Sequence, residues 1–524
     1  MCGIAGIFGQ RSSNDLLDVQ VKKMTQTLSH RGPDDSGFWV NKDYTLALGH
    51  RRLSVLDLSK AGHQPMESSC GRFVMTFNGE IYNHLNIRRE LELKHGRLLW
   101  RGSSDTETVI EGFSKWGIDE TLERMVGMFA LAVWDKSKER LYLSRDRIGE
   151  KPLYFGWSSG NFVFGSELKA IKSLSGFNNE IDRDSLCLYL RHCYIPSPRS
   201  IYKDIYKLQP GCILDLSLKE TLSPPPLSFV SSKLKLRQYW SLKDKVEEGK
   251  QNMITDGQEA SDLLEEALRK SIKLQSIADV PLGCFLSGGI DSSLIASLMQ
   301  SDSISPVHSY SIGFNESDYD EAIYAKKVAE HLGTKHTELY VSSSDALSVV
   351  PKLPNLYDEP FADSSQIPTY LVSKMARDHV TVALSGDAGD ELFGGYNRHL
   401  LAPSLWSLIS FCPQSLRPIF SKAISLFPSS VLNQIGNVIP GTYKTAFLGH
   451  KLHRFADRLD SVMHEDDLYF SLVSEWNNPQ KIVLGSKEPI SFLRDKSLWP
   501  ELDSFQERMM FLDTMTYLPD DILV

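Results

Sequence analysis

The sequence predicts two domains of different class, a layered α+β domain over residues 2–215 and an α/β domain over residues 256–524. In the first, short strand patterns are separated by Gly and Asn turns, with helical patterns between them. In the second, strand and helix patterns alternate from Val280 onward, which is typical of a parallel sheet. Between the two domains the strand and helix patterns become weak, and Pro224-Pro225-Pro226 and a serine-rich stretch occur there. We therefore expect a linker over residues 216–255.

Short strands dominate the first domain. Aromatic and aliphatic runs predict them at residues 73–77, 129–134, 140–144, 154–156 and 162–164. Helical spacing of apolar residues predicts helices over 16–28 and 106–116. Strands grouped together, with helices beside them, indicate a layered α+β arrangement.

The second domain opens with a helical pattern whose apolar face includes Leu263, Leu268 and Ile272. The alternation that follows predicts strands at 280–286, 308–314, 335–341 and 380–384, and helices at 292–299 and 319–332. We expect a parallel sheet covered by helices on both faces, with ligands bound at the carboxyl ends of its strands. The sequence contains no internal repeat and no coiled-coil heptad.

The amino-acid composition argues against several classes of function. The formal net charge of −9 argues against a general nucleic-acid or anionic-membrane binder, since both need a positive surface. No uninterrupted apolar stretch of about 18 residues is present, so we expect no membrane association. The seven cysteines show no Cys-x-x-Cys spacing, which argues against a disulfide framework or a zinc site and favours a reducing, cytoplasmic location.

Cys2 opens the run Cys2-Gly3-Ile4-Ala5-Gly6. If the initiator methionine is removed, Cys2 carries a free thiol and a free α-amino group on one residue. A thiol has a reference pKa of about 8.5 and an α-amine one of about 7.7–8.0, so proton transfer between them is nearly balanced. The pair therefore supplies a nucleophile together with its own general base.

A glycine-rich loop follows the first strand of the second domain and leads into a helix. It reads Ser287-Gly288-Gly289-Ile290-Asp291-Ser292-Ser293. Two glycines allow a sharp turn close to an anion, and hydroxyls, backbone N–H groups and the helix N-terminus supply donors for a pyrophosphate. Asp291 would repel phosphate without a bridging cation, so we interpret it as a magnesium ligand.

A second glycine- and acid-rich string, Ser385 to Tyr396, follows the strand at 380–384. Its carboxylates Asp387, Asp390 and Glu391 are suited to the rim of a metal and nucleotide site. Two phosphate-type loops at strand ends of one sheet indicate an enzyme that cleaves ATP.

With these three motifs, the chain resembles bacterial glutamine-hydrolysing asparagine synthetases from Cys2 to its last residue. The resemblance implies a class II glutamine amidotransferase domain with an N-terminal-nucleophile fold, an αββα sandwich. It further implies an ATP pyrophosphatase-type synthetase domain with extra helices. Arg31-Gly32-Pro33-Asp34 and Arg145 to Tyr154 also fit the family, and we interpret them as structural and loop-ordering elements.

The resemblance assigns the glutamine site. Cys2 would attack the side-chain amide of glutamine, and Asn78 and Gly79 would form the oxyanion hole. The family's glutamine-binding residues match Arg52, Leu53, Ser54, Val55, Leu56, Asn78, Gly79, Glu80 and Asp105.

Within this set, Arg52 would pair with the substrate α-carboxylate and Asp105 would receive the α-amino group. The residues alone leave alternatives open. Arg52 suits a surface ion pair, Asn78-Gly79 suits a hairpin turn, and Asp105 suits a helix N-cap.

The resemblance also assigns the ATP site. Leu286 and Ile312 would hold adenine through their backbone, and Asp291 and Asp390 would hold magnesium on the pyrophosphate. Asp387 stands where the family promotes formation of the β-aspartyl-adenylate, and many members have glutamate there. The predicted ATP-binding residues are Leu286, Ser287, Gly288, Gly289, Asp291, Ser292, Ile312, Ser385 and Gly386.

We therefore expect asparagine synthesis from aspartate, glutamine and ATP with Mg²⁺, and the resemblance suggests a homodimer. Alternatives are amidation of another carboxylate, such as a sugar acid of surface polysaccharide, and a glutaminase or sensing protein with an incomplete synthetase site. The family continues past Tyr517 to Leu523 into a region with a catalytic lysine, whereas this sequence stops at Val524. This predicts a fragment or a natural truncation that hydrolyses glutamine but synthesises asparagine poorly.

Overall fold

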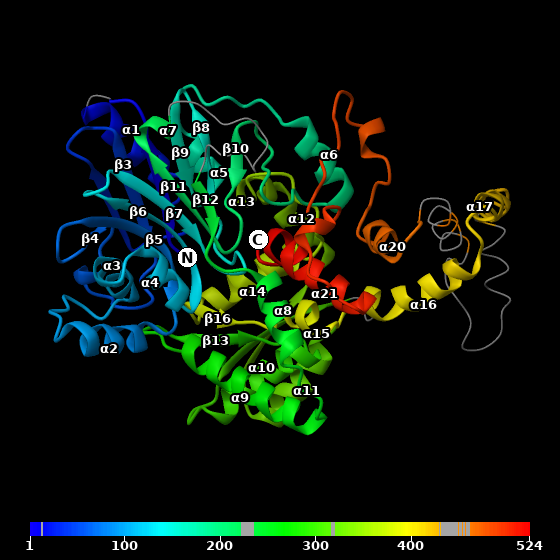
Figure 1. Ribbon diagram of the computed structural model, residues 1–524. Helices are drawn as coiled ribbons and strands as arrows, with labels where there is room; N and C mark the ends of the chain where they lie inside the picture. The colour runs from blue at the N-terminus through cyan, green and yellow to red at the C-terminus, as the bar shows by residue number, and fades with distance from the viewer. Residues whose placement is uncertain are drawn as a thin grey trace.

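The described part of the chain contains two antiparallel sheets and one parallel sheet (Figure 1). The computed structural model describes residues 1–11, 14–221, 235–315, 320–428 and 462–524, together with residues 430, 449, 453, 456 and 459. Within these residues each antiparallel sheet has six strands and the parallel sheet has four. No helix among them is long and apolar enough to cross a membrane.

The first antiparallel sheet contains the N-terminal strand near its centre, in the order β10-β8-β9-β1-β3-β2. β1 pairs with β3 on one side, where Gly3 is opposite Arg51, and with β9 on the other. The strands are β1 (Gly3–Phe8), β2 (Asp35–Val40), β3 (Leu46–Arg52), β8 (Tyr154–Ser158), β9 (Asn161–Gly165) and β10 (Ile205–Lys207).

The second antiparallel sheet has the order β12-β11-β7-β6-β5-β4. Its strands are β4 (Met66–Glu67), β5 (Phe73–Ile81), β6 (Gly127–Asp135), β7 (Arg140–Arg145), β11 (Cys212–Ser217) and β12 (Lys235–Gln238). β12 lies inside the stretch that the sequence suggests as a linker, and it pairs with β11. Pro224-Pro225-Pro226 lies outside the described residues.

The two sheets pack face to face through a buried apolar layer that includes Phe8, Leu48, Ala132 and Leu143. Outside the first sheet, α1 (Asn14–Gln26) and α5 (Leu168–Lys172) cover its second face. Outside the second sheet lie α2 (His84–His95), α3 (Asp105–Lys115) and α4 (Ile118–Arg124). The helix, sheet, sheet, helix order confirms the predicted αββα sandwich.

The Asn78-Gly79 dipeptide does not form a hairpin turn. It lies inside β5, where Asn78 is opposite Ala130 and Gly79 is opposite Phe129 of β6. The strand predicted at 73–77 therefore runs on to Ile81, and the turn interpretation is wrong. Nine consecutive ladder pairs with β6 stabilise this strand through the dipeptide despite its turn propensity.

The parallel sheet has the order β15-β14-β13-β16, built from β13 (Leu282–Phe285), β14 (His308–Phe314), β15 (Lys335–Val341) and β16 (Val382–Leu384). Helices α9 (Gly257–Gln275), α10 (Ile290–Ser301) and α11 (Ala322–Leu332) pack on one face. Helix α14 (Gln366–Arg377) packs on the other. This confirms the predicted α/β class, and Tyr319, where we expected a helix to begin, lies outside the described residues.

The remaining helices form a second cluster beside the parallel sheet. A shared apolar core joins α8 (Leu242–Gln251), α16 (Asn397–Phe411), α20 (Glu465–Leu472) and α21 (Phe505–Met515). In Figure 1, α16 leads away from the body of the molecule to α17 (Arg417–Ser425). The other short helices are α6 (Arg183–His192), α7 (Leu218–Thr221), α12 (Ser343–Val349), α13 (Leu353–Leu356) and α15 (Gly389–Phe393).

Candidate active site

A cavity of about 310 Å³ opens beside Cys2 at the end of β1. Ser54 is the one predicted glutamine-site residue that is not on its lining, and its N–H donates to Asp34 Oδ2 at 2.8 Å. The nine others that line the cavity are Cys2, Arg52, Leu53, Val55, Leu56, Asn78, Gly79, Glu80 and Asp105.

Two contacts hold Cys2 on the wall of this cavity. Arg31 Nε donates to the Cys2 carbonyl at 2.9 Å, and the Leu53 N–H lies 3.4 Å from Cys2 Sγ. Burial raises the pKa of the Cys2 thiol, so a base is needed to form the thiolate near neutral pH. Met1 lines the same cavity, and burial lowers the pKa of its terminal ammonium to about 5.

Asn78 presents an unpaired amide to the cavity. The residue is 1% exposed, and neither its Nδ2 nor its Oδ1 has a hydrogen-bond partner in the described part of the chain. A buried unpaired amide is costly, so such a group indicates a ligand that completes its hydrogen bonds. Next to it, a Cβ on Gly79 would lie 2.1 Å from the Met128 carbonyl, so only glycine fits this position.

Arg52 is buried and holds the loop that follows β3. Its guanidinium donates to the carbonyls of Ser59 at 2.9 Å and Leu56 at 3.3 Å, and also to the carbonyl of Asp57. A guanidinium has five N–H donors, so donors remain for a ligand in the cavity. Arg52 thus orders the loop and faces the cavity, which does not fit the surface ion pair considered from the sequence.

Two acidic residues, Asp105 and Glu80, also line the cavity. Asp105 is the first residue of α3, and its carboxylate accepts the N–H groups of Ile81 and Thr106 at 2.8 and 2.7 Å. The helix N-cap is Ser104, so the N-cap interpretation of Asp105 is wrong. Burial, followed by repulsion from Asp105, raises the pKa of Glu80 to about 7.

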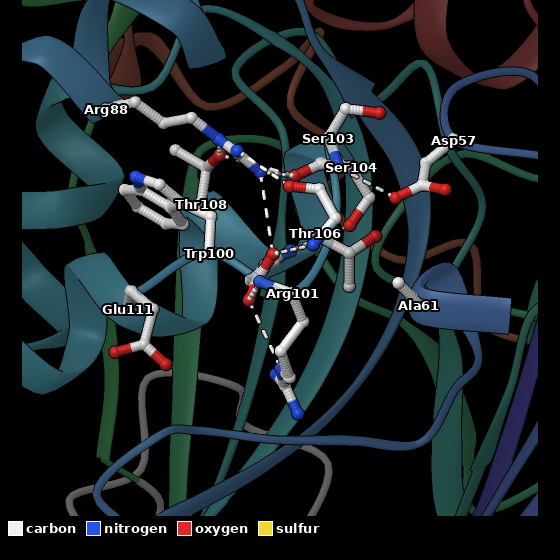
Figure 2. A network of polar contacts seen from close by, with 12 residues as sticks. Asp57, Ala61, Arg88, Trp100, Arg101, Ser103, Ser104, Thr106, Thr108 and Glu111 are labelled. Atoms are coloured by element: carbon white, nitrogen blue, oxygen red, sulfur yellow. Dashed lines mark hydrogen bonds and ion pairs between the residues drawn. The ribbon is translucent and has the colours of Figure 1, made fainter. Parts of the chain in front are cut away.

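A polar network behind the cavity fixes the segment before α3 (Figure 2). Glu107 accepts the Arg101 and Gly102 N–H groups at 2.8 and 3.0 Å, and Arg88 donates to the Ser104 carbonyl at 2.8 Å. The Ser103 N–H donates to Asp57 Oδ2 at 2.8 Å. Asp57 therefore joins the Arg52 side of the cavity to the Asp105 side.

Several cavity residues were not predicted from the sequence. Gln64 accepts the Phe77 N–H at 2.7 Å and donates to Thr106 Oγ1 at 3.3 Å, and Lys151 is buried in the lining. Residues 381–383, at the start of β16, complete the wall from the parallel-sheet domain. Lys151 lies in a motif that we interpreted as structural, whereas no local pattern links residues 381–383 to Cys2.

The glycine-rich loop adopts the shape that the sequence predicts. Gly288 has φ +81°, and a Cβ there would lie 2.6 Å from the Ala325 N atom. Inside the loop, Ser292 Oγ accepts the Ser287 N–H at 3.1 Å and lies 2.8 Å from Ser287 Oγ. Ser293 Oγ is buried without a partner in the described chain, as expected of a donor that awaits an anion.

The acidic string packs directly on this loop. A Cβ on Gly386 would lie 2.8 Å from the Ser292 N atom, and one on Gly389 would lie 2.6 Å from Asp291 Cγ. Burial and then the nearby Asp291 carboxylate raise the pKa of Asp390. The described residues contain no group of three or more potential metal-ligating side chains. Two facing carboxylates nevertheless fit Mg²⁺, which is commonly held by one or two carboxylates together with substrate phosphates.

The other predicted nucleotide residues lie at the same edge of the sheet. Leu286 follows β13, is buried, and its N–H donates to the Tyr310 carbonyl at 2.8 Å. Ile312 is half-buried on β14. Asp387 is exposed, and Ser385 Oγ donates to its carboxylate at 2.6 Å.

A second cavity, of about 270 Å³, lies between the two domains. Its walls include Glu150 and Tyr154 of the first domain and Tyr357 and Glu359 of the second. Met1 is on the lining of both this cavity and the one beside Cys2.

An αββα sandwich with a cysteine beside its central strand, joined to a parallel sheet with two glycine-rich loops at its strand ends, is the architecture of a glutamine-dependent amidotransferase. Residues 1–225 match the family described as glutamine amidotransferase domain, and residues 263–524 match the family described as asparagine synthase. The chain belongs to the glutamine-hydrolysing asparagine synthetase family.

Two relatives are similar in sequence to most of this chain. A Methanocaldococcus jannaschii protein described as a glutamine-hydrolyzing asparagine synthetase is 38% identical over 444 residues, covering 80% of each chain. Asparagine synthetase 1 of Bacillus subtilis is 30% identical over 532 residues, covering 100% of this chain and 76% of its own.

Proposed function

We propose that this protein makes asparagine from aspartate, glutamine and ATP, with ammonia released from glutamine at Cys2. The unpaired Asn78 amide beside Cys2 carries the first half of the proposal, because an oxyanion would complete its hydrogen bonds. The second half is supported by the close packing of the acidic string, Ser385 to Tyr396, on the glycine-rich loop, Ser287 to Ser293, and by the relatives named as asparagine synthetases.

At the first site, removal of Met1 frees the Cys2 α-amine. The freed α-amine is the base that takes the thiol proton, since the reference pKa of an α-amine, about 7.7–8.0, is close to that of a thiol. The thiolate attacks the glutamine amide carbon, and Asn78 Nδ2 donates to the oxyanion. When this intermediate collapses, the carbon–nitrogen bond breaks and the α-ammonium returns its proton to the leaving nitrogen, so ammonia departs and a thioester remains. Water then hydrolyses the thioester to glutamate and the free thiol.

Substrate orientation at this site rests on opposite charges. The free donors of Arg52 hold the α-carboxylate of glutamine, and Glu80 with Asp105 holds its ammonium group. All three groups line the same cavity as Cys2, so a glutamine held at both ends in it is confined next to the thiol.

At the second site, donors of Ser287, Gly288, Gly289, Ser292 and the α10 N-terminus bind the phosphates of ATP. Asp291 and Asp390 would hold Mg²⁺, which supplies charge neutralisation on the pyrophosphate. Asp387 belongs to the acidic string that packs on the glycine-rich loop. We place the side chain of the substrate aspartate, which becomes the acyl-adenylate, beside it. Leu286 and Ile312 contribute the adenine pocket.

An internal route for ammonia follows from the two cavities. Met1 lines both, and Cys2 lines the first, so the support for the route is that one residue borders both cavities next to the proposed nucleophile. Walls that exclude water protect an acyl-adenylate from hydrolysis.

The test measures asparagine formation from glutamine, aspartate and ATP, with pyrophosphate release followed across a panel of carboxylic acids. We expect aspartate to be the preferred acceptor. Preference for another carboxylate would assign a different product, and glutamine hydrolysis without any ATP cleavage would refute the synthetase half.

A further inference from the structure

A hydrogen-bonded pair joins the glutamine-binding loop to the synthetase domain. The Asp57 N–H donates to Asp279 Oδ2 at 2.9 Å, and the Asp279 N–H donates to the Val55 carbonyl at 3.0 Å. The two segments are 222 residues apart in sequence. From this reciprocal pair we infer that Asp279, which lies outside the amidotransferase domain, is a positioning residue for glutamine binding; the inference rests on the proposed function.

Asp57 is the residue through which this contact acts. Its N–H bonds to Asp279, its carbonyl accepts from the Arg52 guanidinium, and its carboxylate accepts from the Ser59 N–H at 3.1 Å and the Ser103 N–H. Its φ of +57° lies in the left-handed region, which a residue other than glycine adopts when its surroundings hold it there. The contacts on every side of Asp57 therefore determine the shape of the loop.

The loop shape in turn orients Arg52. Three loop carbonyls, of Leu56, Asp57 and Ser59, accept from its guanidinium, so a displaced loop displaces the donors proposed for the glutamine α-carboxylate. A Cβ on Gly62 would lie 1.9 Å from an Arg52 guanidinium nitrogen, so the side chain has little freedom to compensate. Loss of the Asp279 contact should thus weaken glutamine binding more than it slows the attack by Cys2.

Residues around Asp279 also bring the synthetase domain against the glutamine cavity. Residue 279 immediately precedes the segment that enters β13, and the Thr381 N–H donates to the Pro281 carbonyl at 3.0 Å. Residues 381–383 wall the glutamine cavity itself. The same end of the parallel sheet therefore closes the cavity and holds the loop that lines it.

The test compares Asp279→Ala with wild type, Asp279→Asn and a control, Asp262→Ala. Asp262 is an exposed residue of α9 whose carboxylate bonds to Gln258 of the same helix. We expect Asp279→Ala to raise the glutamine KM about three- to tenfold, with kcat within about twofold, since one hydrogen bond to a charged acceptor is lost. Asp279→Asn retains an acceptor oxygen and should restore KM to within about twofold.

Ammonia-dependent asparagine synthesis separates positioning from general damage. It should stay within about twofold of wild type in Asp279→Ala, as should every activity of Asp262→Ala. An unchanged glutamine KM, or equal losses of ammonia-dependent and glutamine-dependent synthesis, would overturn the inference. If Asp279→Ala folds poorly, Asp279→Ser, whose shorter side chain falls short of the Asp57 N–H, carries the same expectation. Absence of glutamine hydrolysis in wild type would instead refute the proposed function.

Discussion

Glu80 should make glutamine binding depend on pH near neutrality. Burial and the neighbouring Asp105 raise its pKa from 4.5 to about 7, a difference that corresponds to about 3 kcal/mol. In the empty cavity Glu80 is therefore largely protonated at pH 6 and largely ionised at pH 8. Glutamine brings an ammonium group that favours the carboxylate, so binding below pH 7 must release a proton.

The size of the effect follows from this titration. Because the ionised fraction of a group with a pKa of about 7 falls about tenfold between pH 8 and pH 6, kcat/KM for glutamine should fall by the same factor through Glu80 alone. Cys2 also titrates, so the informative quantity is the ratio of kcat/KM in wild type to that in Glu80→Gln. We expect this ratio to decline about tenfold from pH 8 to pH 6.

Two further measurements check the assignment. The raised pKa of Glu80 makes the folded wild-type protein lose stability as pH rises from 4.5 to 7, because the buried carboxyl group has to ionise. Glu80→Gln removes this group. The unfolding temperature of this variant should therefore rise relative to that of wild type between pH 5 and pH 8, because only the wild type loses this stability over that range. Asp105→Asn removes the like charge and should shift the midpoint of the ratio to lower pH. A ratio that is flat between pH 6 and pH 8 would refute the reasoning.

Three other substitutions test the separate sites. Cys2→Ala should abolish glutamine hydrolysis and leave ammonia-dependent synthesis intact. A folded Cys2→Ala variant without ammonia-dependent synthesis would contradict two independent sites. Blocking the removal of Met1 should have the same effect as Cys2→Ala. Asp291→Asn should abolish pyrophosphate release from ATP with glutaminase activity within a few-fold, and normal release would reduce Asp291 to a helix-start residue. Gly288→Ala should lower pyrophosphate release at least about a hundredfold. The φ of residue 288 is +81°, and a Cβ there would lie 2.6 Å from the Ala325 N atom, so alanine does not fit. Release near the wild-type rate would show that the loop tolerates displacement.

The elements of both domains could be predicted from local patterns. The aromatic and aliphatic runs at 129–134 and 308–314 form strands, and the apolar spacing from Leu263 to Ile272 forms a helix. The exception in β5 is instructive, since Asn78-Gly79 favours a turn locally but is held extended by pairing with β6. Ladder pairing between distant segments overrides local propensity there.

The candidate site could be predicted where a short motif carries several cavity residues. Arg52 to Leu56 and Asn78 to Glu80 contribute seven of the nine predicted residues that line the cavity beside Cys2. Residues 381–383 and Asp279 have no such pattern. They meet the glutamine site only because the two domains pack together, and a contact across 222 residues leaves no trace in local composition.

The direction of the parallel strands explains how the two sites are related. β13 and β16 begin beside the glutamine cavity, through Asp279 and residues 381–383, and end at the Ser287 and Ser385 loops. β16 has three residues and so spans about 10 Å at about 3.3 Å per residue. The buried Cys284 side chain lies on β13 between these ends, so the ammonia route proposed above runs beside the strands and not through the sheet. The proposed ammonia passage therefore uses the cavity between the domains, which has Met1 on its wall together with side chains of both domains.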